Sequence, residues 1–95
     1  MIKISISKDE ITIKGHSGYS VEGSDIVCAS VSSIAITTVN SLLRIDEDCI
    51  EYEEKDGYLN IKINKNNEII DKLIDNMIDL LKELEKQYKK NIEIR

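Results

Sequence analysis

The sequence predicts an α+β fold in which a mostly antiparallel five-stranded sheet has two helices packed on one side. Two observations lead to this fold class. Short stretches in which apolar and polar residues alternate are typical of half-buried strands. Two longer stretches, with apolar residues three and four positions apart, predict amphipathic helices. The element order is ββαββαβ, and residues 1–95 are too few for two separate cores, so a single domain is expected.

The first hairpin is predicted from isoleucines at alternate positions. Isoleucine alternates with polar residues over 2–6 and again over 11–13, with a polar turn at 8–10 between them. A period of two places alternate side chains on one face of a sheet, so these segments are expected to pair as antiparallel strands.

The second hairpin is predicted around the dipeptide Asp56-Gly57. Asp-Gly favours a tight turn because both positions tolerate a positive φ, and alternating stretches at 50–54 and 58–63 flank it. The tail at 91–95 alternates once more and is expected to form a short final strand.

The first helix is predicted to begin after Ser24 or Asp25 and to run to about Arg44. Both side chains can cap a helix N-terminus. Many residues in this stretch are β-branched, so a strand is a competing interpretation on propensity alone. The apolar face of the helix comprises Cys28, Val31, Ala35, Val39 and Leu42.

The second helix has the clearest pattern in the chain. Asn66 or Asn67 can cap it, and the charged residues over 82–90 are expected to form its solvated face. Its apolar face comprises Ile70, Leu73, Ile74, Met77, Leu81, Leu84 and Tyr88.

Residues 15–24 interrupt these patterns with a glycine-rich segment. Gly15, Gly18 and Gly23 lie within ten positions together with three serines, which predicts a loop whose backbone can shape a pocket. The glycine spacing fits neither GxGxxG nor a Walker A motif, so a phosphate-binding loop is not expected.

Composition narrows the classes of function. A net charge of −5 argues against nucleic-acid binding and suits a basic protein partner. No apolar run is expected to approach the length of roughly 20 residues that is needed to cross a membrane. A cytoplasmic protein is therefore expected. Cys28 and Cys49 are expected to be free thiols, and one histidine with two separated cysteines predicts no metal site and no cofactor.

The chemistry of the chain centres on His16 and Cys28. His16 is the only histidine, and Cys28 follows twelve residues later, as the third helical residue if Asp25 is the cap. A helix N-terminus beside an imidazole favours the nucleophilic thiolate, and its free amides could hold an oxyanion. The alternative interpretations are a surface or structural histidine and a cysteine that is merely a small buried apolar residue.

Three further side chains have more than one interpretation. Asp25 can cap the helix or orient His16 as the third member of a triad. Ser32, one turn after Cys28, can support the site or contact substrate, or can be a small packing residue. Cys49 has no base or glycine-rich loop beside it in the sequence and is interpreted as structural or incidental.

The motif GHSGY at 15–19, followed by G-x-D-I-V-C-A-x-V-S at 23–32, resembles the signature of the ribosomal-processing cysteine proteases, the Prp family. Chain length and element order also agree with that family. The resemblance implies a cytoplasmic, homodimeric cysteine endopeptidase, a thiol protease with a glycine-rich loop, here about 17–24, over its active site. It implies a ribosome-biogenesis role, trimming the N-terminal leader of basic ribosomal large-subunit protein twenty-seven after a hydrophobic stretch with paired aromatics.

By the same resemblance, Cys28 would be the nucleophile and His16 the general base and acid. Asp25 and Ser32 would be supporting residues. The substrate loop would include Gly15, Ser17, Gly18, Tyr19 and Gly23. Ser17 departs from the family, in which alanine is frequent at this position, and this small change leaves the chemistry intact.

Three rival hypotheses stand beside the protease. The chain could be a non-catalytic ribosome-assembly factor that binds the same ribosomal protein. It could be a thiol redox sensor using Cys28 and Cys49, although no CxxC motif is present. Composition alone would favour a small structural α+β subunit.

Overall fold

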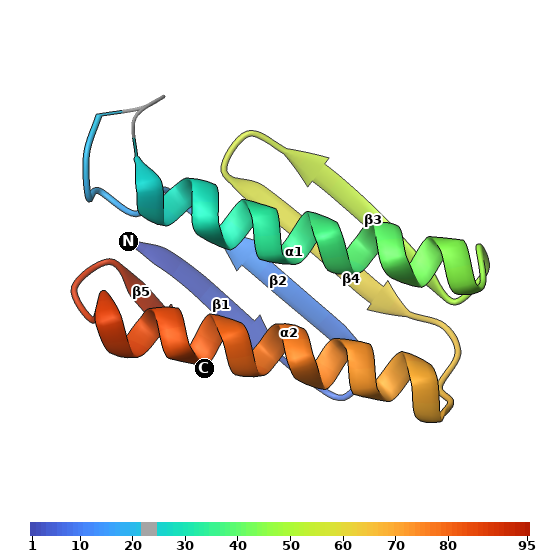
Figure 1. Ribbon diagram of the computed structural model, residues 1–95. Helices are drawn as coiled ribbons and strands as arrows, with labels where there is room; N and C mark the ends of the chain where they lie inside the picture. The colour runs from blue at the N-terminus through green and yellow to red at the C-terminus, as the bar shows by residue number, and fades with distance from the viewer. Residues whose placement is uncertain (22–24) are drawn as a thin grey trace.

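The computed structural model describes residues 1–21 and 25–95, and it has the predicted ββαββαβ order (Figure 1). All seven predicted elements are confirmed, with ends that shift by one or two residues. In chain order they are β1 (Ile2–Ile6), β2 (Glu10–Lys14), α1 (Ile26–Ile45), β3 (Ile50–Lys55), β4 (Tyr58–Ile63), α2 (Glu68–Gln87) and β5 (Ile92–Ile94).

The five strands form one sheet in the order β3-β4-β2-β1-β5. Both predicted hairpins are present, and β2 joins them by pairing antiparallel with β4. The exception is β5, which pairs parallel with β1, so the sheet is mixed. A parallel neighbour needs a long crossover connection, and here the rest of the chain lies between the two strands.

Both helices lie side by side on one face of the sheet, as Figure 1 shows. The core lies between the two layers. The sheet contributes the buried residues Ile2, Ile4, Ile11, Ile13, Ile50, Leu59, Ile61 and Ile92. The helices contribute Val27, Val31, Ala35, Val39, Leu42, Ile70, Ile74, Met77 and Leu81. Burying this apolar surface is the main favourable contribution to folding.

Asp25 is the N-cap of α1, which decides between the two predicted caps. Its carboxylate accepts hydrogen bonds from the backbone amides of Val27 and Cys28, both at 3.0 Å. The competing strand interpretation of this segment is wrong. The cap and the packing of one apolar face against the sheet outweigh the poor helix propensity of the β-branched residues.

The expectation that no apolar run is long enough to cross a membrane is also wrong. By length and composition alone, α1 is long and apolar enough to cross a membrane, since it has 20 residues and its single charged residue is Arg44. Serines and threonines scattered through the segment obscured this run. In the fold, α1 turns its apolar face to the sheet and packs beside α2, as the core helix of a globular domain does.

Three segments meet at one end of the sheet. The segment after β2, the start of α1 and the turn between β3 and β4 lie close together there. The amide of Gly15, at the end of β2, donates a 2.8 Å hydrogen bond to the carbonyl of Gly57 in the β3–β4 turn. This bond brings the two hairpins together beside the first turn of α1.

Candidate active site

The loop that carries the histidine leaves β2 through Gly15. Its φ is +97°, and a Cβ there would lie 2.5 Å from the carbonyl oxygen of Met1. Only glycine fits this conformation and this close approach. The sharp turn directs the following residue, His16, toward the β3–β4 turn.

His16 lies against the β3–β4 turn. Its Nε2 is 3.9 Å from Oδ2 of Asp56, and its side chain is 56% exposed. The next residue in the turn, Gly57, has a positive φ of +67°, and a Cβ on it would lie 2.9 Å from that same Nε2. The imidazole therefore occupies space that any other residue at position 57 would fill.

Cys28 is the third residue of α1, as predicted, and its side chain is half-buried. Its Sγ accepts a 3.2 Å hydrogen bond from the backbone amide of Ser17. Ser17 follows His16 directly in the chain. The loop that positions the imidazole therefore also contacts the sulfur.

Asp25 is the centre of a hydrogen-bond network beneath the loop. Its carboxylate accepts from the Ser17 hydroxyl and from the Ser20 amide, in addition to the two helix amides. The pKa of Asp25 falls from 3.8 to about 2, mainly through the Ser17 hydroxyl, and burial partly opposes this decrease. Asp25 is therefore a charged cap, and its carboxylate is bonded to Ser17 and to backbone amides, whereas Asp56 is the carboxylate near His16.

The helix amides expected to hold an oxyanion are already bonded. Those of Val27 and Cys28 donate to the Asp25 side chain, and that of Ala29 donates to the Asp25 carbonyl at 3.1 Å. An amide that caps a helix in this way is no longer free to stabilise a developing negative charge. The amides of Val27, Cys28 and Ala29 therefore already have partners in this structure, and the prediction that the helix amides hold an oxyanion stays a prediction.

His16 and Cys28 line one cleft of about 560 Å³. Gly15, Gly18, Ser20, Asp25 and Ser32 line it too, and its apolar walls include Ile2, Ile13, Val31, Ala35, Ile36 and Leu59. Residues 54–58 of the second hairpin also line the cleft. The cleft therefore brings a thiol, an imidazole and an apolar surface together.

The remaining predicted loop residues lie in different places. Ser17 is buried behind the sulfur with 2% of its surface exposed. Tyr19 packs edge-on against Tyr88 at the end of α2, with ring centroids 5.5 Å apart. Gly23 lies outside the described residues.

Sequence reasoning missed Asp56, Gly57 and Asn91 as residues of the site. The sequence predicts a turn at 56–57, and the structure has this turn. Nothing in the local sequence predicts that the turn lies beside His16. Asn91 donates a 2.9 Å hydrogen bond from its side-chain amide to the carbonyl of Ser17, 74 residues earlier. No pattern in the sequence indicates that contact.

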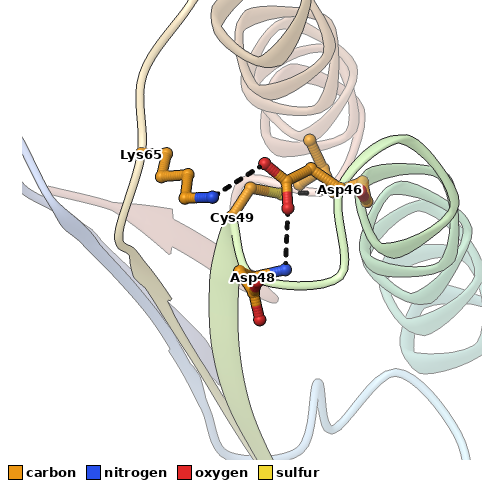
Figure 2. Close-up of polar contacts among 5 residues, drawn as sticks. Asp46, Asp48, Cys49 and Lys65 are labelled. Carbon is orange, nitrogen blue, oxygen red and sulfur yellow. Dashed lines mark hydrogen bonds and ion pairs between the residues drawn. The ribbon is translucent and has the colours of Figure 1, made fainter.

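Cys49 is separate from the site, beyond the C-terminal end of α1. It is fully buried, and its thiol donates a 3.4 Å hydrogen bond to the carbonyl of Leu42. Figure 2 shows it beside Asp46, which pairs with Lys65 at 3.2 Å. Burial raises the pKa of the Cys49 thiol, and the Asp46 charge raises it further. Burial together with a raised pKa is typical of a structural thiol of low reactivity.

This fold, with a thiol at the start of a helix and an imidazole in the same cleft, has the make-up of a small cysteine protease domain. The family model described as Cysteine protease Prp matches residues 1–93, and the chain belongs to this family.

Two curated relatives are named ribosomal processing cysteine protease Prp. The Mycoplasma genitalium protein is 39% identical over 54 residues, which are 57% of this chain and 52% of the relative. The Mycoplasma pneumoniae protein is 47% identical over 34 residues, which are 36% of this chain and 34% of the relative. The aligned segments thus span about half and about a third of these relatives.

Solved structures resemble the whole fold. One is the ribosomal processing protease Prp of S. aureus in complex with a covalently linked product peptide. It has a TM-score of 0.86 and 23% identity and covers 99% of this chain and 95% of its own. Another is SMU.848 from Streptococcus mutans, with a TM-score of 0.76 and 26% identity, covering 99% of this chain and 90% of its own.

Proposed function

We propose that this chain is a cysteine endopeptidase that removes the short N-terminal extension from the precursor of ribosomal large-subunit protein twenty-seven. The observation that carries the proposal is the shared cleft, in which Cys28 and His16 lie in a chain of the cysteine protease Prp family. Relatives named ribosomal processing proteases support the substrate class.

In this mechanism, His16 takes the proton of the Cys28 thiol, and the thiolate attacks the carbonyl carbon of the scissile peptide bond. The proton then passes from the imidazole to the amine of the leaving peptide as the C–N bond breaks. A water molecule, deprotonated by His16, hydrolyses the thioester and returns the thiol. Because Nε2 lies near Asp56, we assign the proton transfers to Nδ1.

The cleft walls suit the proposed substrate. Ile13, Val31, Ile36 and Leu59 line the cleft, and an apolar stretch with paired aromatics before the cut would bury surface against them. The net charge of −5 favours encounter with a basic ribosomal protein. Ser32, one helical turn from Cys28 and also in the cleft, is proposed to contact the peptide.

The other parts of the proposal concern the setting of the reaction. We assign Asp25 a supporting role as the charged cap that fixes the first turn of α1. Gly15, Ser17, Gly18 and Tyr19 form the described part of the proposed substrate loop. The active form is proposed to be a cytoplasmic homodimer that binds neither nucleic acid nor membrane.

Cleavage of a synthetic leader peptide, followed by mass spectrometry, tests the proposal. The parent protein and a Cys49→Ala control should release the same two fragments. Cys28→Ala should be inactive, and His16→Ala should be slower by at least about 100-fold, the usual contribution of a general base. Cleavage by Cys28→Ala at the parent rate would refute the mechanism. Binding of the peptide without cleavage by the parent would favour the assembly-factor hypothesis instead.

The redox-sensor hypothesis gains no support from the positions of the two thiols. Cys28 lies at the start of α1, whereas the Cys49 thiol contacts Leu42. The rise of 1.5 Å per residue separates positions 28 and 42 by about 21 Å along the helix. A disulfide needs Cα atoms within about 7 Å, so these two cysteines cannot pair within one folded chain.

A further inference from the structure

Asn91 reaches the site from the far end of the sequence. It lies in the turn between α2 and β5, and its side-chain amide donates to the Ser17 carbonyl at 2.9 Å. Its backbone amide donates a hydrogen bond to the carbonyl of Tyr88, and its carbonyl accepts one from the backbone amide of Ile2, both at 2.8 Å. The main chain of Asn91 is therefore fixed without its side chain, which is free to hold the loop.

Ser17 has every polar group engaged. Its amide donates to Sγ of Cys28, its carbonyl accepts from Asn91, and its hydroxyl donates to Asp25. With 2% of its surface exposed, it has almost no contact with water. The orientation of its amide toward the sulfur is therefore set by the partners of its other two groups.

We propose that Asn91 is a positioning residue for the Cys28 nucleophile and that it acts through the backbone of Ser17. This inference rests on the proposed function, in which Cys28 attacks the substrate. An amide hydrogen bond stabilises a thiolate more than a neutral thiol because the acceptor is charged. Hydrogen bonds weaken steeply as their angle departs from linearity. By holding the Ser17 carbonyl, Asn91 keeps the amide aimed at Sγ.

The loop has a second attachment to the same end of α2. Tyr19 packs on Tyr88, and this ring contact does not involve Asn91. Removing the Asn91 amide therefore leaves the loop attached but less well oriented. The expected defect is a loss of thiolate stabilisation at Cys28 in a protein that still folds.

Two variants of Asn91 test the proposal against one matched control. Asn91→Ala removes the side-chain amide, and Asn91→Asp keeps the shape but replaces the donor with an acceptor. Asn66→Ala makes the same chemical change at an exposed asparagine between β4 and α2, at the opposite end of the molecule in Figure 1. Thermal unfolding shows which variants fold, and if Asn91→Ala does not, Asn91→Asp carries the same test.

The first measurement is the rate of Cys28 alkylation by iodoacetamide at pH 6 and pH 10. At pH 6 few thiols are ionised, so both Asn91 variants should react roughly three- to tenfold more slowly than the parent. At pH 10 most thiols are thiolates, so the difference between the variants and the parent should disappear. Equal rates at pH 6, an equal slowing at both pH values, or a parent-like rate for Asn91→Asp would overturn the proposal.

The second measurement is cleavage of the leader peptide. Both Asn91 variants should lose roughly three- to tenfold in kcat, because the Ser17 amide acts on the proposed nucleophile. Any rise in KM that accompanies this loss reflects the proposed substrate loop, to which Ser17 also belongs. Asn66→Ala should match the parent in both assays. A rise in KM with an unchanged kcat would overturn the proposal. If the parent itself does not cut the peptide, the proposed function fails, and the alkylation rates still test Asn91.

Discussion

Ser17 connects Cys28, the proposed nucleophile, to the charged cap of α1. Its amide contacts Cys28, and its hydroxyl donates to the Asp25 carboxylate. That hydroxyl is the largest cause of the lowered pKa of Asp25. A serine at this position, where the family resemblance implies alanine, thus adds a buried hydrogen bond to the site.

The lowered pKa of Asp25 makes stability depend on pH. The pKa is about 2 in the folded protein against a usual 3.8, so the folded state holds this proton more weakly. The stabilisation is fully present above pH 3.8 and is lost as the pH falls through about 2. Ser17→Ala should raise the pKa of Asp25 and make this acid decrease shallower.

Denaturant unfolding at several values from pH 2 to pH 6 measures this change. Ser30→Ala is the matched control, because its hydroxyl donates to the carbonyl of Ile26 on the exposed side of α1. That control should keep the steep acid decrease of the parent. An equally steep decrease in Ser17→Ala would show that the hydroxyl does not stabilise the charged carboxylate.

Gly57 controls the position of His16 from the neighbouring hairpin. A Cβ at Gly57 would lie 2.9 Å from Nε2 of His16, and its φ of +67° disfavours any other residue. Gly57→Ala should therefore destabilise the fold by about 1 kcal/mol or more and lower kcat. Urea unfolding and peptide cleavage measure the two effects.

A double-mutant cycle separates the clash from the backbone strain. In a His16→Ala background the clash is absent, while the strain at position 57 remains. Gly57→Ala should then cost less stability than it does in the parent. Equal costs in both backgrounds would mean that the imidazole does not occupy the space above Gly57.

At the scale of elements, the N-caps of the two helices make different contacts. Asp25 caps α1 and also bonds Ser17 and Ser20, whereas Asn67 caps α2 through a 2.9 Å bond from the amide of Ile70. Asp25 thus belongs both to the helix and to the site. Asn67 caps the start of α2, and this end of the helix lies at the other end of the sheet (Figure 1).

Removing each cap should therefore give different results. Asn67→Ala should cost about 1 kcal/mol of stability and leave peptide cleavage unchanged. Asp25→Ala should lower the melting temperature further and also slow cleavage and Cys28 alkylation. Differential scanning calorimetry with the two assays makes the comparison. A fully active Asp25→Ala would show that the cap stabilises the helix without supporting the site.

At the scale of the whole molecule, charge should affect how fast substrate arrives. The net charge is −5, and the proposed substrate is a basic ribosomal protein. Salt screens such long-range attraction, with a Debye length of about 10 Å at 0.1 M. For the intact precursor, kcat/KM should fall from 50 to 500 mM NaCl, while kcat should stay nearly constant.

A short uncharged leader peptide is the control for this effect. Its kcat/KM should change little with salt, because it has no basic region to attract. Stopped-flow cleavage of both substrates measures the difference. An equal salt effect on both substrates would place its cause in the enzyme and not in long-range attraction.

The fold was largely predictable from the sequence because its signals are local. Alternating isoleucines, the Asp56-Gly57 turn and the long apolar face of α2 each predict an element, and all were found. The parallel pairing of β5 was not predictable, because strand neighbours depend on the path of the whole chain. The sequence analysis did not predict that α1 is long and apolar enough to cross a membrane, because serines and threonines interrupt its apolar run.

The site was predictable only in part. The positions of His16 and Cys28 followed from the loop and from the helix start, and the two residues line one cleft. The contacts of Asp56 with His16 and of Asn91 with Ser17 were not predictable, since each joins segments far apart in the chain. The hydrogen bonds from the Val27 and Cys28 amides to the Asp25 carboxylate were not predictable either, because they depend on the rotamer of Asp25.

In the proposed mechanism, the thiol of Cys28 attacks the scissile carbonyl of a bound leader peptide. The most direct measurement uses a leader peptide that ends in a chloromethyl ketone at the scissile position, followed by peptide mapping of the labelled protein. We expect one adduct, on Cys28, that forms with loss of cleavage activity and that forms much more slowly in His16→Ala. Labelling of Cys49 instead, or full activity after Cys28 is labelled, would contradict this mechanism.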